Sequence, residues 1–265
     1  MSAAGTGPRP AATPRPFKIA LMAALSLEVR PFLRHIGARR YRGLGLPAWE
    51  FALGEGRGVV ALSGMGYSLA QAATAQLLAR CRPAILMSVG FGGALTPEVP
   101  AGALVLGESF WQYHPKSGVL EEVPAPLSPR PLPELLRRLK GNGLAAFTGS
   151  LVTTPYIISK KRQGEALRHL ATPVLDLETS ALAQAATANG LPFVSLRAIT
   201  DVAFEEIPDF IQEALEPGRK FGLGTVFTWL AADPRRAKTL LHLRRRSRLA
   251  ALLLARALNL LLSVI

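Results

Sequence analysis

Short apolar segments alternate with helical patterns along most of the chain, and this alternation constrains the fold more than any other feature. The apolar segments have the length and bounding turns of buried strands. Alternation of this kind is typical of an α/β domain with a mostly parallel sheet. Strands are predicted within residues 17–29, 58–66, 84–95, 102–110, 149–159, 173–178 and 191–201. Helices are predicted within residues 68–83, 160–170 and 179–190. Between them we expect glycine turns at 64–66 and 90–93, a hairpin turn at 54–58 and a proline-rich loop at 115–135.

The chain is predicted to form one domain between two tails. With 265 residues, 49% of them hydrophobic, it can bury one sizeable core. Residues 1–16 are rich in Pro, Gly, Ala and Thr without apolar periodicity, which favours a disordered leader. The apolar run that follows could belong to a signal peptide, but its end at an acidic residue favours a buried strand. We therefore divide the chain into a leader (1–16), a domain (17–232) and a basic amphipathic helix (233–265).

Lysine and arginine give the chain a formal net charge of +13, and they are concentrated in residues 30–42 and 235–256. This charge suggests nucleic acid, an anionic membrane surface or an anionic ligand as a partner. The final apolar stretch is shorter than the roughly 20 residues that span a membrane, and it contains Arg256. It can lie on an anionic membrane surface, or dock on the domain or a partner subunit. The tail lacks interleaved aromatic residues, so we expect no nucleic acid.

No segment has the pattern of a metal or nucleotide-cofactor site. The four histidines lack ligand spacing, and the single cysteine, Cys81, excludes an internal disulfide and a zinc site of several cysteines. The segments GMG and GFGG lack the spacing of the dinucleotide fingerprint. We expect a protein without metal or cofactor, in the cytoplasm or on the inner face of the membrane, because nothing requires an oxidising compartment.

Carboxylates follow three of the predicted strands at their carboxyl ends. Glu28 comes just after the first strand, Glu178 follows VLDL, and Asp201 follows FVSLRAIT. Ligands of open α/β sheets bind at this edge, so we expect the three acids to meet there, with Asp176 in a supporting position. One carboxylate can accept sugar hydroxyls, a second can take a proton from water, and a third can protonate a leaving group. These groups suit the cleavage of a glycosidic bond.

Five segments, AALSLEV, SGMG, SVGFGGAL, LDLETSALA and FVSLRAITD, occur in this order at family-like intervals. They resemble the nucleoside phosphorylase superfamily, of the methylthioadenosine and adenosylhomocysteine nucleosidase type, over residues 17–210. The resemblance implies a three-layer α/β sandwich with a mixed, mostly parallel central sheet. It also implies a homodimer that hydrolyses the N-glycosidic bond of a 5'-modified purine nucleoside and releases adenine or a related base.

The resemblance implies a role for each matched residue. Glu28 would activate the attacking water, Glu178 would hold the ribose hydroxyls, and Asp201 would protonate or hydrogen-bond N7 of the leaving purine. The remaining positions are expected to contact the substrate: Leu177, which replaces the family's methionine, Gly66, Gly92, Phe91, and Tyr156 or Ile157 as a wall for the base.

Departures from the family pattern bear on the chemistry. Ser88 and Phe91 stand where the hexameric phosphorylases have an arginine and a serine that contact phosphate. The missing arginine favours hydrolysis over phosphorolysis. The tail is similar to that of the hopanoid-associated phosphorylases, so phosphorolysis of adenosylhopane or a similar nucleoside is one alternative. A non-catalytic, membrane-associated nucleoside-binding module is another, because Phe91 and Leu177 both depart from the pattern.

Overall fold

The computed structural model describes residues 17–126, 128, 130–203, 205 and 234–265, and in them strands and helices alternate as predicted. The predicted leader and most of the segment before the C-terminal helix lie outside the described residues. The strands are β1 (Phe17–Ala23), β2 (Arg39–Arg40), β3 (Ala48–Leu53), β4 (Gly56–Leu62), β5 (Ile85–Ala94), β6 (Leu104–His114), β7 (Val119–Glu122), β8 (Ala146–Thr153), β9 (Val174–Asp176) and β10 (Phe193–Asp201). The helices are α1 (Ser26–His35), α2 (Tyr67–Cys81), α3 (Leu132–Gly141), α4 (Lys160–Gln163), α5 (Thr179–Ala188) and α8 (Pro234–Leu262), with a 3-10 turn at Glu165–Leu167.

All the strands join one mixed sheet in the order β10-β6-β8-β9-β5-β1-β4-β3-β2, and β7 pairs with β6. Strand β5 pairs in parallel with both β1 and β10, and β1 pairs in parallel with β4. Because β10 also pairs with β6, the strands β10, β6, β8, β9 and β5 close into a ring. This closure brings the ends of β5, β9 and β10 together.

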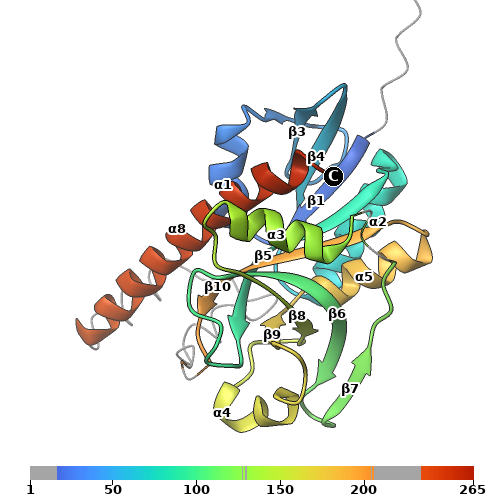
Figure 1. Cartoon of the computed structure of the whole chain (residues 1–265). Helices are drawn as coiled ribbons and strands as arrows, with labels where there is room; N and C mark the ends of the chain where they lie inside the picture. Colours follow the sequence, from blue (N-terminus) through green and yellow to red (C-terminus); the bar gives the residue numbers. More distant parts are fainter. Residues whose placement is uncertain (1–16, 127, 129, 204, 206–233) are drawn as a thin grey trace, which may run out of the picture.

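Helices cover both faces of the sheet (Figure 1), which confirms the predicted α/β sandwich. Helices α2 and α5 pack in one buried cluster, and α1, α3 and α8 pack in the other. Side chains alternate between the two clusters along β1: Ala20 and Met22 belong to the first, and Ile19 and Leu21 to the second. A strand segment with helices on both faces is buried on both sides, which explains why residues 19–23 of β1 are all apolar, whereas Lys18 at its start is exposed.

The C-terminal helix α8 docks on the domain over its last three turns or so. Ala250, Leu254, Leu258 and Leu261 follow a helical spacing and are fully buried against α1, α3 and β10 (Figure 1). Of the alternatives that the sequence leaves open, docking on the domain therefore describes residues 250–262. Among the described residues, no helix has the length and hydropathy to cross a membrane.

Some predicted boundaries are wrong, and others are confirmed. The expected turn at 90–93 lies inside β5, because this strand continues to Ala94 and pairs with β9 and β10 along its glycines. The expected loop at 115–135 contains β7, which pairs with the long end of β6, and the start of α3. Strand β8 ends at Thr153, so the segment 154–159 is not a strand. The hairpin turn between β3 and β4 is confirmed by the antiparallel pairing of Leu53 with Gly56.

Candidate active site

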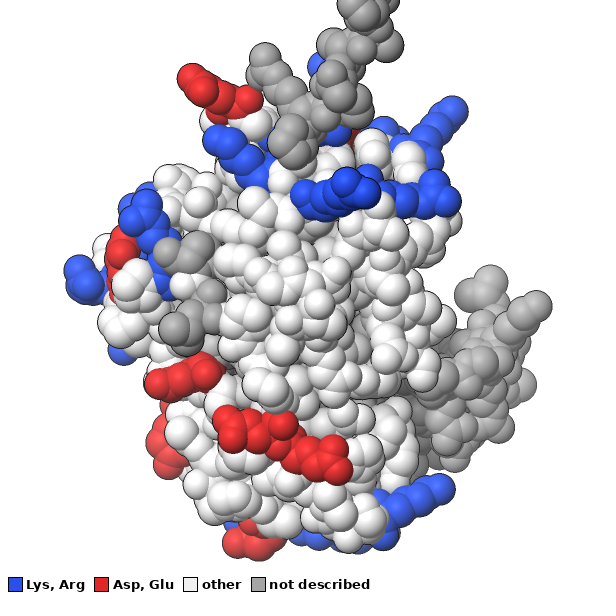
Figure 2. All heavy atoms as spheres, turned by 90° about the vertical axis from the view of Figure 1, so that its right-hand side faces the viewer, with Lys and Arg blue, Asp and Glu red and all other residues white. Residues whose placement is uncertain are grey.

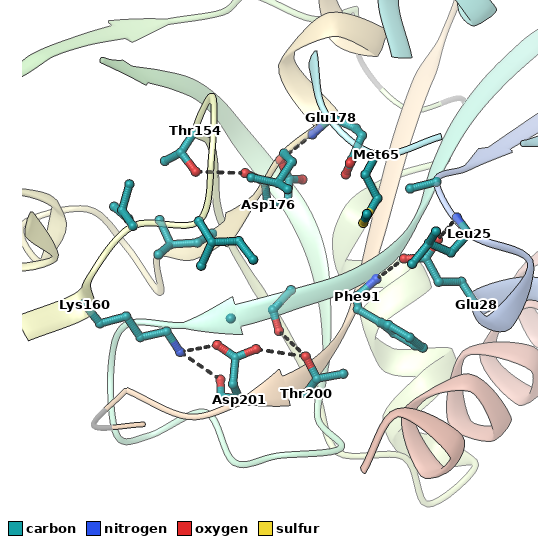
Figure 3. Close-up of a pocket in the computed structure, with 17 residues that line it drawn as sticks. Leu25, Glu28, Met65, Phe91, Thr154, Lys160, Asp176, Glu178, Thr200 and Asp201 are labelled. Atoms are coloured by element: carbon teal, nitrogen blue, oxygen red, sulfur yellow. Dashed lines mark hydrogen bonds and ion pairs between the residues drawn. The ribbon is translucent and has the colours of Figure 1, made fainter. Parts of the chain in front are cut away.

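A cavity of ≈ 180 Å³ lies at the carboxyl ends of the central strands, and Glu28, Glu178 and Asp201 all line it (Figure 3). These three residues come from α1, the start of α5 and the end of β10. Parallel pairing of β1, β5 and β10 brings their ends to one edge, and the elements that follow deliver the side chains. The convergence expected from the sequence is therefore present.

Glu28 lies in the first turn of α1 and is 5% exposed. The Leu25 N–H donates to its Oε2 at 2.8 Å, and the Phe91 N–H donates to its Oε1 at 2.9 Å. Burial raises the pKa of Glu28, while these two N–H groups and the charge of Arg197 act in the opposite direction. A carboxylate that is fixed by two donors and raised in pKa is suited to accept a proton from water.

Glu178 immediately precedes α5, and its Oε1 accepts a hydrogen bond from the Gly66 N–H at 2.8 Å. Burial, followed by the nearby Asp176 carboxylate, raises the pKa of Glu178 to about 8. With this pKa, the side chain is mostly a neutral carboxyl at neutral pH, with one O–H donor and further acceptor positions. Such a group can donate to one sugar hydroxyl and accept from another.

Asp201 is the last residue of β10 and is 5% exposed. The Thr200 hydroxyl donates to its Oδ1 at 2.9 Å, and the Lys160 ammonium lies 2.5 Å from its Oδ2. Both oxygens are thus held, and the carboxylate faces the cavity (Figure 3). The sequence analysis did not identify Lys160, because α4 belongs to a polar segment with several basic residues.

Arg197 is a second residue that the sequence analysis missed. It is 1% exposed, and its Nε donates to Asp176 at 2.9 Å. Its other donors reach the Ser88 hydroxyl at 2.8 Å and the Thr179 hydroxyl at 2.6 Å. The guanidinium lies behind the cavity wall and holds Asp176, which itself lines the cavity. A lone arginine within the apolar segment FVSLRAIT could have indicated this buried pair, since a buried charge requires a partner.

Two glycines of β5 allow the carboxylates to approach the strand. A Cβ at Gly90 would lie 2.7 Å from Glu28 Oε1, and a Cβ at Gly93 would lie 2.4 Å from Asp201 Oδ2. Real Cβ contacts are longer than this, so a side chain at either position would displace a carboxylate. The glycines in GFGG therefore act through close approach inside a strand, and not through a turn.

The other sequence-predicted residues divide between the cavity and its surroundings. Phe91, Gly92, Ile157 and Leu177 line the cavity, together with Met65, Thr154 and Lys160, which the sequence analysis did not single out. Gly66 lies outside this lining but holds Glu178. Tyr156, which follows the end of β8, is 38% exposed and is not among the residues that line the cavity. Within the described residues, no cluster of three potential metal ligands occurs.

The segments that build this cavity fall within one family match: a model described as the phosphorylase superfamily covers residues 18–224. This chain belongs to the phosphorylase superfamily. A 5'-methylthioadenosine/S-adenosylhomocysteine nucleosidase of Tolumonas auensis is 26% identical over 225 residues, which covers 77% of this chain and 94% of the relative. A nucleosidase of the same name from Geobacillus kaustophilus is 27% identical and covers 69% of this chain and 84% of the relative.

Solved structures of this superfamily have the same fold. The Neisseria meningitidis 5'-methylthioadenosine/S-adenosylhomocysteine nucleosidase, in complex with methylthio-immucillin-A, matches with a TM-score of 0.70 and 21% identity, over 93% of this chain and 99% of that chain. The futalosine hydrolase of Helicobacter pylori matches with a TM-score of 0.65 and 16% identity, over 92% and 97% of the two chains. At these identities the superfamily fold is shared, and the substrate must be argued from the site.

Proposed function

We propose that this protein hydrolyses the N-glycosidic bond of a 5'-modified purine nucleoside and releases adenine or a related base. The observation that carries the proposal is the meeting of Glu28, Glu178 and Asp201 around one cavity. The relatives named as 5'-methylthioadenosine/S-adenosylhomocysteine nucleosidases support it.

Each acid has a distinct part in the proposed reaction. Glu28 takes a proton from the water that attacks C1' of the ribose, Glu178 binds the ribose hydroxyls, and Asp201 delivers a proton to N7 of the departing purine. Their surroundings support this division, since the three carboxyl groups are held by different partners and have different charge environments. Ile157, Leu177 and Phe91 supply apolar surface for the base and sugar.

The charges around the cavity favour water over phosphate as the nucleophile. Among the described residues that line the cavity, Lys160 is the one cation, and it is paired with Asp201. The Arg197 guanidinium behind the wall is engaged by Asp176, Ser88 and Thr179. Neither side chain offers the bidentate fork that typically binds a phosphate.

Base release from a panel of 5'-substituted adenosines and inosines, followed by mass spectrometry, tests the proposal. We expect a free 5'-modified ribose as the product both with and without phosphate in the buffer. A ribose 1-phosphate product that forms only when phosphate is present would instead support phosphorolysis of adenosylhopane or a similar nucleoside. Glu28→Gln should lower turnover by about 10²-fold or more, as is typical for loss of a general base. Glu165→Gln, an exposed acid on the 3-10 turn, is the matched control. Unchanged turnover in Glu28→Gln would remove Glu28 as the general base, and no base release from any nucleoside of the panel would favour a non-catalytic binding module.

We also propose that a second copy of the chain covers α2. The exposed positions Leu69, Ala72, Ala75 and Ala79 give this helix an apolar outer stripe, and Arg80 in its last turn is the exposed charged residue of the helix. Figure 2 shows that the face including α2 and α5 has a broad area free of charged side chains, with basic residues above it and acidic residues below. Sedimentation velocity should give a dimer for the wild-type protein and a monomer for Ala72→Glu. Val119→Glu, on the exposed strand β7, should remain dimeric.

Finally, we propose that the C-terminal segment 233–265 makes two kinds of contact. Its buried side chains dock on the domain, and its exposed side chains bind the inner face of an anionic membrane. Leu241, Leu249 and Leu252 are 55%, 52% and 59% exposed on the same helix as exposed arginines such as Arg244 and Arg248. Apolar and basic residues together favour an anionic lipid surface. The full-length protein should float with phosphatidylserine-containing vesicles, whereas the variant with serine at these three leucines should not. Equal flotation of both proteins would remove the proposal.

A further inference from the structure

We propose that Lys160 and Asp201 act as one acid, in which Lys160 holds the proton that Asp201 passes to N7 of the leaving purine. This proposal rests on the proposed nucleosidase function and deepens it. Lys160 acts through Asp201 and does not itself react with the substrate. The Asp201 carboxylate is ion-paired with Lys160 through Oδ2 and accepts a hydrogen bond from Thr200 through Oδ1.

The contacts of Lys160 account for all three of its donors. Its Nζ lies 2.5 Å from Asp201 Oδ2, 3.2 Å from the Asp201 carbonyl oxygen and 2.9 Å from the Val202 carbonyl oxygen. An ammonium group has three N–H donors, so none remains for the substrate. Lys160 is also 4% exposed, which separates the pair from bulk water. The ammonium is thus aimed at the carboxylate.

The neighbouring backbone is shaped around this pair. A Cβ at Gly93 would lie 3.1 Å from both Cε and Nζ of Lys160, besides its clash with Asp201. Strand β5 therefore leaves room for the pair, which is a built feature of the site.

No other described charge competes for Asp201. The remaining charged groups near the cavity are Glu28 on α1, Glu178 before α5, and the Asp176–Arg197 pair of β9 and β10. Glu28 and Glu178 are held by backbone N–H groups, and Arg197 is held by Asp176. Among the described residues, Lys160 is thus the charged partner of Asp201.

The geometry of the ion pair determines where the proposal places the transferable proton before the reaction. The Lys160 ammonium donates toward Asp201 Oδ2, so the proposal places this proton on Lys160. When the C1'–N9 bond breaks, its electron pair moves onto the purine. Lys160 Nζ gives a proton to Asp201 Oδ2, which gives it to N7, while Glu28 takes a proton from the attacking water. Afterwards Glu28 releases its proton to solvent and the neutral Lys160 amine takes up a proton from solvent. Each turnover therefore consumes one water molecule and no net proton.

Two variants of Lys160 separate proton transfer from simple ion pairing. In Lys160→Met, the buried Asp201 loses its ion-pair partner and its proton source. We expect base release about 10²-fold or more below the wild-type rate at pH 8, and a smaller loss at pH 5, where the solution supplies protons more readily. Lys160→Arg keeps the charge but cannot give up a proton. We therefore expect Lys160→Arg to be slow at both pH values, while Lys161→Met, on the exposed next residue, keeps the wild-type profile.

Two results would overturn the proposal. Full rescue of turnover by Lys160→Arg would leave Lys160 as an ion-pairing residue alone, and an equal loss at pH 5 and pH 8 in Lys160→Met would indicate a structural defect. If Lys160→Met does not fold, Lys160→Gln replaces it, since its amide still donates to the Asp201 and Val202 carbonyls.

A readout that needs no turnover separates this proposal from the proposed function. Lys160→Met should lower the melting temperature, because it leaves a buried carboxylate without its cation. Part of this loss should be recovered in Lys160→Met combined with Asp201→Asn. Equal or larger losses in the double variant would overturn the pairing on which the inference depends. An inactive wild-type protein that shows the expected melting behaviour would instead reject the nucleosidase function.

Discussion

Gly90→Ala should separate catalysis from stability, because the new methyl group would meet only the carboxylate tip of Glu28. The added Cβ would lie 2.7 Å from Oε1 and 3.3 Å from Cδ of Glu28, whereas ordinary contacts begin at 3.4 Å. The carboxylate must therefore move by about 0.7 Å. The Phe91 N–H donates to Oε1 at 2.9 Å, so a movement of this size can take that bond beyond hydrogen-bonding length.

The expected magnitudes differ strongly between the two properties. A misplacement approaching 1 Å at a reacting group costs about 10²-fold in rate, so we expect turnover to fall by roughly that factor. The side-chain tip can yield, so the stability loss should be limited to one weakened hydrogen bond of a charged group, about 1–3 kcal/mol. In a domain of this size, that corresponds to a melting temperature lowered by roughly 2–4 °C per kcal/mol.

Base release under saturating nucleoside and differential scanning calorimetry measure the two effects. Gly141→Ala is the matched control, because a Cβ there has nothing within 4 Å, and both of its properties should stay at wild-type values. Turnover of a folded Gly90→Ala protein within threefold of wild type would refute the reasoning. It would mean that the position of Glu28 does not limit the reaction.

Three further predictions concern charge and packing. Folding raises the pKa of Glu178 from 4.5 to about 8, so the free energy of unfolding should fall as pH rises through this window. The fall should be at most about 5 kcal/mol, and it should be smaller because the side chain faces the cavity. The melting temperature of Glu178→Gln should depend less on pH than that of the wild-type protein. Arg197→Met leaves Asp176 buried without its cation and should cost about 3–5 kcal/mol in urea unfolding, with part of this recovered by adding Asp176→Asn. Leu258→Ala in the docked part of α8 should cost about 2–5 kcal/mol, whereas Leu252→Ala, at an exposed position, should be nearly neutral.

The sequence analysis missed two residues of the site, of which only Arg197 could have been found from the sequence, and it placed Tyr156 differently from the structure. Arg197 interrupts an apolar strand, and such a residue needs a buried counter-charge, which Asp176 supplies. Lys160 gives no comparable signal, because three basic residues occur together at 160–162 and sequence spacing does not distinguish them. Tyr156 was expected to form a wall because aromatic rings suit bases, but β8 ends before it and its side chain is exposed.

The sequence by itself determined the α/β class, the sheet edge that carries the site and the three acids that meet there. Strand periodicity and the placement of acids after apolar strands are local properties, and parallel strands necessarily bring their carboxyl ends to one edge. Only the tertiary structure decided that β10, β6, β8, β9 and β5 close into a ring, that Gly90 and Gly93 lie beneath carboxylates, and that Lys160 pairs with Asp201. It also decided that the end of the basic tail packs in the core. These features depend on contacts between residues that are distant in the chain, which no local pattern contains.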